Sequence, residues 1–356
     1  MWACIANLAE GAALLRHYLD GLAKQNNLVA LDPDTCGAAA PKIKELQEHF
    51  SSKNNKARYE YNTVIVSLYG YLERYVEDLI GEYLAVVSEH VSTYAELPEA
   101  IRANHLMLSL ELIRKADYQR NAGTVRPEHV IANLHGCLNE LEKYELNVRA
   151  FAQHTANLRH STVTAMCSRC GIADIGPALR TAEAFRGFLA KENPERDVDT
   201  YLAGSDEIVF ARLDDLANRR NDVAHGTPPD DILSHDLLRE LIDFVETYAK
   251  GLALVLYERA LPLMVSRAKH LGAAIRVIDH RIVCVNLPTG RVVVGDTLIA
   301  KTQDASRPFK GGSIREIQRD HVPLESVDGG PGVQIGVRVD FGAKDNHDFY
   351  LLPLTR

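Results

Sequence analysis

Residues 61–87 read YNTVIVSLYGYLERYVEDLIGEYLAVV and carry a regular hydrophobic pattern. Apolar side chains recur every three or four positions, whereas Glu73, Arg74, Glu77 and Asp78 occupy other sides. This period is that of an amphipathic α-helix. The apolar positions are Tyr61, Val64, Ile65, Leu68, Leu72, Tyr75, Val76, Leu79, Tyr83 and Val87. The stretch predicts a long helix that buries one face.

Two further runs have the same period and predict two more long helices. One covers residues 130–151 and the other residues 237–255. Additional helices are expected over residues 8–22 and 98–113. Pro98 is compatible with the second helix, since proline is tolerated in a first helical turn. Together these helices predict an all-α unit.

A helix is also expected from about Asp206, with one apolar face formed by Ile208, Val209, Leu213 and Leu216. It should end at the helix-breaking residues Gly226, Pro228 and Pro229. Residues 191–205 before it lack a period and predict a surface loop. Ser234 is expected to cap the helix that follows.

After about residue 270 the pattern changes to short β-branched runs, at 274–278, 281–285, 291–294 and 333–339. Turn residues separate them, at 288–290, 311–312 and 329–332. This density of short strands and turns is typical of a small barrel or sandwich. The expected fold is therefore multi-domain α + β, a helical bundle followed by a small all-β barrel.

A chain of 356 residues with 46% hydrophobic and 25% charged residues is typical of a folded protein of two domains. We predict an N-terminal helical extension over 1–57, a helical domain over 58–268 and a β domain over 269–356. The net charge of -8 argues against broad wrapping of nucleic acid, so any RNA contact should be confined to a cleft.

The chain shows no apolar run of membrane-spanning length, and Met1 to Cys4 do not resemble the start of a secretory signal. The six cysteines are dispersed, as suits a reducing compartment. We therefore expect a cytoplasmic protein without a membrane partner.

The string Arg220-Asn221-Asp222-Val223-Ala224-His225, followed by Gly226, has a spacing that a metal-free ribonuclease can use. An arginine can hold a scissile phosphate, and a histidine can move protons on and off ribose oxygens. On an ideal helix the two side chains would point about 140° apart. We expect Gly226 to allow a distorted last turn that turns the ring of His225 toward Arg220. The amide of Asn221 could bond a phosphate or hold the histidine.

This motif and its long flanking helices resemble the HEPN superfamily, an all-α ribonuclease fold found in many toxins and defence proteins. Residues 61–74, with 94–98, are similar to its RiboL-PSP-HEPN branch, and the resemblance spans about residues 58–260. It implies a metal-independent endoribonuclease without a cofactor, leaving 2′,3′-cyclic phosphate and 5′-hydroxyl ends. It also implies RNA as a partner, such as tRNA or another structured RNA, and an antitoxin or regulatory protein.

By motif position, the resemblance makes Arg220 and His225 the catalytic pair and Asn221 the adjoining polar residue. Glu73 occupies the acidic position of the early helix and could support the site. Some small HEPN toxins carry a modified tyrosine two positions beyond the histidine, where this chain has Thr227. Control by that modification is therefore not expected.

One Arg–His pair makes a small active site, so a homodimer that joins two pairs across a two-fold axis is expected. Nearby cations could add RNA contacts, namely Arg219 and a cluster of Arg159, His160 and Arg169. Acidic residues around the motif argue against RNA binding, namely Asp214, Asp215, Asp222, Asp230 and Asp231.

The β region shows a weaker similarity to the second β-barrel domain of translational GTPases, carried by residues 287–298 and 314–321. There is no phosphate-binding loop, so no GTPase is implied. The barrel could dock on a ribosome, a tRNA or a protein. It could equally only buttress the dimer or bind something unrelated.

Two alternatives remain open at this point. The chain could be a non-catalytic HEPN interaction or nucleotide-binding module, with Arg220 paired to Asp222 or Asp215. Cys167 and Cys170 have the spacing of half a zinc site or a redox pair, but the sequence offers no second pair of ligands. We therefore expect no metal.

Overall fold

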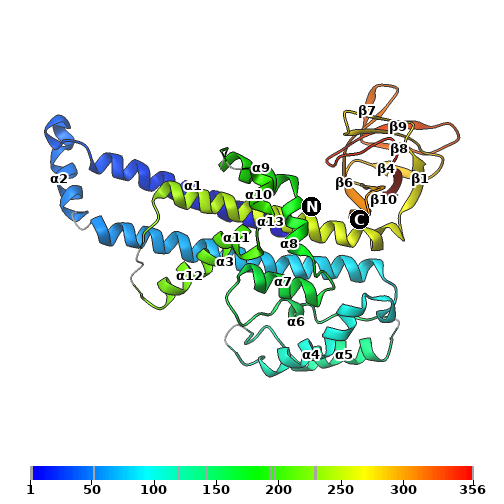
Figure 1. The fold of residues 1–356 in the computed structure, drawn as a ribbon, viewed down its shortest axis with the longest axis horizontal. Helices are drawn as coiled ribbons and strands as arrows, with labels where there is room; N and C mark the ends of the chain where they lie inside the picture. Colours follow the sequence, from blue (N-terminus) through cyan, green and yellow to red (C-terminus); the bar gives the residue numbers. More distant parts are fainter. Residues whose placement is uncertain are drawn as a thin grey trace.

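The structure, a computed structural model, describes residues 3–354 except 51–52, 119–120, 142, 193, 196, 228–230 and 306. A helical unit is followed by a β unit that packs on the end of the last helix (Figure 1). This confirms the expected order of a helical bundle and a small β domain. Among the described residues, no helix combines the length and apolarity needed to cross a membrane.

The helical unit is built around α1 (Ala3–Val29), α3 (Lys53–His90) and α13 (His235–Val265), which pack along one another (Figure 1). Their apolar faces share one core. The hydroxyl of Tyr75 in α3 donates to the carbonyl of Ala249 in α13 at 2.6 Å. The helices predicted at 8–22, 61–87 and 237–255 are confirmed, and each is longer than predicted.

The N-terminal residues contribute directly to this core. A Cβ at Gly11 of α1 would lie 2.8 Å from the ring of Tyr71, so the missing side chain allows α1 to approach α3 closely. The 3-10 turns η1 (Pro33–Thr35) and η2 (Gly37–Ala39) and helix α2 (Ala40–His49) lead from α1 to α3. The segment that we set apart as an extension thus packs as part of the helical unit.

The long helix predicted over 130–151 is wrong. The chain forms α5 (Pro127–Leu138) and then α6 (Val148–Ala152). Asn139 ends α5, and Glu140 has a φ of 50°, a left-handed conformation in which a right-handed helix cannot continue. Two amphipathic stretches that are in phase across a gap look like one helix in the sequence.

Helix α4 (Glu99–Arg114) packs against α5 and α6 beside one end of α3 (Figure 1). Pro98 precedes it as the N-cap residue, so the helix begins one residue later than predicted. His105 of α4 is fully buried, and its Nε2 accepts a hydrogen bond from the backbone N–H of Asn147 at 3.0 Å. This histidine is a satisfied core residue.

Burial lowers the pKa of His105 to about 4, below its ordinary value of 6.5. The unfolded chain therefore binds a proton at this site that the folded chain does not, and the free energy of unfolding should fall as the pH drops from about 6.5 toward 4. Urea unfolding at several pH values should show a flatter pH slope for His105→Gln than for the unmodified protein. Identical slopes would contradict this role.

The next segment forms α7 (His160–Arg169), α8 (Ile175–Thr181), α9 (Glu183–Glu192), α10 (Val198–Leu202), α11 (Asp206–Val209) and α12 (Ala211–Ala224). The loop predicted over 191–205 is wrong in part, because α10 lies within it; the carboxylate of Asp197 accepts from Thr200 and caps this helix. The motif helix is interrupted at Phe210, whose backbone leaves helical geometry. Ile208, expected on the apolar face, is 55% exposed as a result.

The β unit confirms the strands predicted after residue 270. Its main sheet is antiparallel, with the order β1-β10-β5-β6-β9-β3-β2, and β7 pairs with β6. β4 pairs separately with β8. The strands are β1 (Lys269–Ala273), β2 (Arg276–Ile278), β3 (Ile282–Asn286), β4 (Arg291–Val293), β5 (Thr297–Lys301), β6 (Phe309–Arg319), β7 (Val322–Leu324), β8 (Ser326–Asp328), β9 (Gln334–Val339) and β10 (Asp348–Leu352). The sheet curves around its own core as a half-barrel.

The β unit is attached to α13 by apolar packing and by charge. Tyr350 and Leu352 of β10 pack against the helical core. Nε of Arg307 lies 3.1 Å from the carboxylate of Glu258 in α13. A Cβ at Gly311 of β6 would lie 2.9 Å from the side chain of Leu261, so this strand approaches the helix closely.

Candidate active site

Helix α12 ends in a Schellman motif formed by the residues after the arginine pair. The N–H of Thr227 donates to the carbonyl of Asp222 at 2.9 Å, and the N–H of Gly226 donates to that of Val223 at 3.2 Å. Gly226 has a φ of 70°, which a residue without a Cβ adopts without strain. The predicted end of the helix at Gly226 is confirmed, while Pro228 and Pro229 lie outside the described residues.

His225 is the C-cap residue of α12 and is exposed. Its N–H still donates to the carbonyl of Asn221 at 2.9 Å, so the last turn keeps helical geometry. The chain departs from the helix only at Gly226, and the expected distortion at the histidine is wrong. Within the described residues, the imidazole makes no hydrogen bond or ion pair, with Arg220 or any other group.

Arg220 stacks on an aromatic ring instead of pairing with an acid. Its guanidinium carbon lies 5.0 Å from the centre of the Tyr69 ring, a cation–π distance. Nη1 lies 3.4 Å from Oδ1 of Asn221, a long contact. Across the described chain, no carboxylate lies within ion-pair distance of Arg220. Among the described residues, Tyr69 and Asn221 therefore hold the guanidinium in place without neutralising its charge.

The buried Tyr69 is itself fixed in position. Its hydroxyl accepts a hydrogen bond from the backbone N–H of Leu158 at 2.8 Å. Tyr69 belongs to α3, and Leu158 to the segment between α6 and α7. The platform under Arg220 thus joins three parts of the chain that are far apart in sequence.

Arg219, the neighbour of Arg220, points to different partners. Its Nε donates to Asp215 at 2.6 Å, and its Nη1 donates to the hydroxyl of Tyr61 at 3.1 Å and to the carbonyl of Asp231 at 3.0 Å. Its side chain is only 18% exposed. These contacts hold α12 on α3, and they leave Arg219 little capacity for the RNA contact considered from the sequence.

Replacing Arg219 with alanine should therefore lower stability. The loss of charge-assisted hydrogen bonds to half-buried partners should reduce the free energy of unfolding by about 1.5–3 kcal/mol. Arg220→Ala is the matched control, because it loses only a stacking contact of about 0.5–1 kcal/mol. Urea unfolding of both variants measures the difference. Equal losses would show that Arg219 has no special structural role.

A loop beside the motif carries a histidine that the sequence did not single out. Nε2 of His154 lies 3.4 Å from Glu73 and 3.5 Å from Glu77, and its Nδ1 bonds the carbonyl of Ala156 at 2.8 Å. Arg159 in the same loop donates to Asn218 of α12. Glu73 therefore lies one turn from Tyr69 on α3 and helps to anchor this loop. The Glu73–Glu77 spacing was the only sequence signal of a basic partner here.

The structure does not gather Arg159, His160 and Arg169 into one cationic cluster. His160 is buried, stacks on Phe210 at 3.8 Å and bonds the hydroxyl of Tyr248 at 3.0 Å. Nη1 of Arg169 donates to the carbonyl of Gln153 at 2.6 Å and so stabilises the loop that carries His154. Of the three, Arg159 reaches α12 with its guanidinium, whereas His160 reaches it only through its backbone N–H.

Some of the acidic residues around the motif are occupied. Asp214 accepts a hydrogen bond from the N–H of His160 at 3.1 Å, at the start of α7. Asp215 pairs with Arg219, whereas Asp222 is exposed and Asp230 lies outside the described residues. Among the described acidic residues, Asp215 and Asp231 lie within ion-pair distance of Arg219, and none does so with Arg220.

The thiols of Cys167 and Cys170 are buried in the helical core. Burial raises the pKa of Cys170 to about 12 and that of Cys167 further, so both thiols keep their protons at neutral pH. In the described ranges, no three His, Cys, Asp or Glu side chains are grouped as metal ligands would be. The positions of these two cysteines are those of packing residues.

A family model described as RiboL-PSP-HEPN matches residues 40–258, which is more than half of the chain. The match begins before the resemblance noted in the sequence, within α2, and ends inside α13. It includes the arginine–histidine motif, all of α3 and most of α13. No curated protein matches the chain. The chain belongs to the RiboL-PSP-HEPN family, within the HEPN superfamily.

Proposed function

We propose that the protein is a metal-independent endoribonuclease in which Arg220 and His225 carry the reaction. HEPN domains are often ribonucleases, and membership in the family supports RNA as the substrate class. The observation that carries the proposal is the state of Arg220. Its guanidinium is stacked on Tyr69 and has no described acidic partner, while the adjacent Arg219 makes the ion pair with Asp215.

In the proposed reaction, an imidazole removes the proton of a ribose 2′-hydroxyl and the 2′-oxygen attacks the phosphorus. The bond from phosphorus to the 5′-oxygen breaks, and an imidazolium gives a proton to that oxygen. Arg220 neutralises the charge that grows on the phosphate oxygens, and Asn221 could bond the phosphate or the sugar. The products are a 2′,3′-cyclic phosphate and a 5′-hydroxyl.

A homodimer would supply both imidazoles at once, one neutral as the base and one protonated as the acid. A two-fold interface is self-complementary, so two copies of the exposed end of α12 could meet across it. Exposed apolar residues on the neighbouring part of α3 would suit such an interface, with Tyr59 at 79% and Val66 at 46% exposure. The proposed assembly is therefore a dimer with a shared groove.

The alternative is a non-catalytic module in which Arg220 pairs with a nearby acid such as Asp215 or Asp222. Arg219 makes the pair with Asp215, and Asp222 is exposed without a described ion pair. We therefore favour the nuclease. A role as a toxin or anti-phage effector, restrained by an antitoxin or another regulatory protein, is the biological setting that we propose for it.

The test is to incubate purified protein with total RNA in the presence of EDTA and to analyse the new ends. We expect cleavage that EDTA does not reduce. The 5′ ends should accept phosphate from polynucleotide kinase without prior dephosphorylation, and the 3′ ends should resist ligation until the cyclic phosphate is opened and removed. Cleavage that requires a divalent cation, or that leaves 5′-phosphates, would overturn the proposal.

A further inference from the structure

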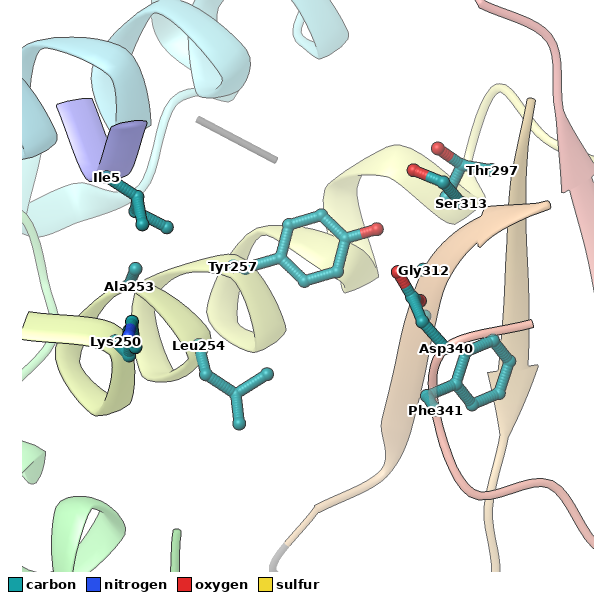
Figure 2. A pocket seen from close by; sticks show the side chains of 11 residues that line it. Ile5, Lys250, Ala253, Leu254, Tyr257, Thr297, Gly312, Ser313, Asp340 and Phe341 are labelled. Atoms are coloured by element: carbon teal, nitrogen blue, oxygen red, sulfur yellow. The ribbon is translucent and has the colours of Figure 1, made fainter. Parts of the chain in front are cut away.

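A cavity of about 300 Å³ lies between the helical unit and the β unit. None of the residues that line it belongs to the motif helix α12. Its walls come from α13, from β6 and from the turn after β9 (Figure 2). This volume is at the lower end of the range for small-molecule sites, which often lie between domains. We propose that the cavity binds a guanine mononucleotide, with the base between Leu254 and Phe341 and its N–H edge on Asp340.

The two side walls are apolar and face each other. Leu254 of α13 points into the gap and is 38% exposed, and the half-buried ring of Phe341 lies on the opposite side (Figure 2). A flat heterocycle between an aliphatic and an aromatic side chain would bury both faces and remove this apolar surface from water. The shape therefore favours a planar ligand over a sugar or a peptide.

The end of the cavity at the β unit carries polar groups beside Phe341, and its strongest acceptor is Asp340 (Figure 2). Oδ2 of Asp340 accepts from Arg315 at 2.7 Å, which orients the carboxylate. A Cβ at Gly312 would lie 1.9 Å from Oδ1 of Asp340, closer than two atoms can approach. The glycine at position 312 therefore leaves the space that the Asp340 carboxylate occupies. A carboxylate only accepts hydrogen bonds, so it selects a ligand edge that donates.

Guanine fits this end better than the other bases do. It presents two adjacent donors, the N1–H and the 2-amino group, beside an acceptor oxygen. Adenine presents an acceptor, N1, next to its amino group, and that lone pair would face the carboxylate. Hydroxyls that can donate line the same end, from Tyr257, Thr297 and Ser313 (Figure 2). Burial raises the pKa of Tyr257 well above its ordinary value, so its hydroxyl keeps its proton.

At the opposite end of the cavity, Lys250 offers a cation to the phosphate. Its side chain is 53% exposed, and its Nζ lies 3.6 Å from Glu246, a distance that leaves it able to meet a second anion. The ribose and phosphate are attached at N9, on the side of guanine away from its N1–H and 2-amino edge. They would therefore extend away from Asp340, toward the end of the cavity where Lys250 lies (Figure 2). The ligand would contact both α13 and the β unit.

The test is isothermal titration of the full chain with GMP, IMP and AMP. We expect GMP to bind with a Kd on the order of 10–100 µM. IMP lacks the 2-amino donor and AMP has the wrong edge, so each should bind at least about tenfold more weakly. Absence of measurable GMP binding at 1 mM ligand, roughly the weak limit of the range, or equal affinity for AMP would overturn the proposal.

Two variants examine the site itself. Asp340→Asn should weaken GMP binding at least about tenfold by placing an amide where the acceptor was. Leu254→Trp should abolish binding by filling the cavity from the helix side, with every residue of the β unit left unchanged. Arg338→Gln, on the exposed side of β9, is the control and should bind normally. Unchanged GMP affinity in Leu254→Trp would sink the proposal.

Discussion

Replacing His225 with alanine should reduce RNA cleavage by about 100-fold or more, because the variant lacks the group that moves protons to and from the ribose oxygens. The effect should fall on the rate of the chemical step and not on folding. His225 is exposed, and its side chain makes no hydrogen bond within the described chain. Single-turnover cleavage of a defined RNA, with the thermal melt recorded in parallel, measures both.

His129→Ala is the matched control for this variant. His129 is also an exposed histidine near a helix end, in α5, and is remote from the motif in sequence. It should cleave RNA at the normal rate. If His225→Ala cleaves as fast as His129→Ala, the histidine has no part in the reaction and the proposed mechanism is wrong.

Replacing Arg220 with alanine should reduce the cleavage rate by about 100- to 1,000-fold, through loss of charge stabilisation in the transition state. Arg220→Lys should recover only part of this activity, because an ammonium lacks the planar fork that bonds two phosphate oxygens and stacks on Tyr69. Rates for the two variants at saturating enzyme test this order. Full activity in Arg220→Ala would refute a role for the guanidinium.

Two comparisons separate this effect from simple loss of structure. Arg219→Ala should be less stable but should retain activity at a temperature where it is folded, because its guanidinium is committed to Asp215 and Tyr61. An excess of His225→Ala added to the unmodified protein should lower its cleavage rate through subunit exchange, since each mixed dimer would hold one imidazole where the mechanism uses two. A cleavage rate that the excess variant leaves unchanged would count against that groove.

Some features of this chain could be predicted from local pattern because their causes are local. The helix over 61–87 follows from its hydrophobic period, which places the apolar side chains on one face whatever element later covers that face. The end of α12 at Gly226 follows from a residue that adopts a positive φ without strain. The β unit follows from short branched runs between glycine turns. The single helix predicted over 130–151 is wrong because that prediction also used only the local pattern. The hydrophobic period of α5 continues in α6, and a period does not show that the chain leaves the helix at Glu140.

The arrangement around the motif depends on contacts between distant segments. Arg219 and Arg220 are adjacent and chemically identical, and the sequence offers no reason to give them different roles. On a helix they point about 100° apart, so the docking of α12 on α3 turns one toward Asp215 and Tyr61 and the other onto Tyr69. His154 reaches Glu73 only because a loop folds back across α3.

The amino-acid sequence by itself determined the two-part α and β organisation, the long helices, the position of the arginine–histidine string and the place where its helix ends. Each of these follows from hydrophobic period or backbone preference within a short window of residues. Only the tertiary structure decided which arginine pairs with Asp215 and which stacks on Tyr69, and which histidines are buried in the core. It also decided that a cavity ending at Asp340 opens between α13 and the β unit. These features depend on how the packed helices and strands are rotated and how far apart they lie. Contacts between residues that are far apart in the sequence determine both.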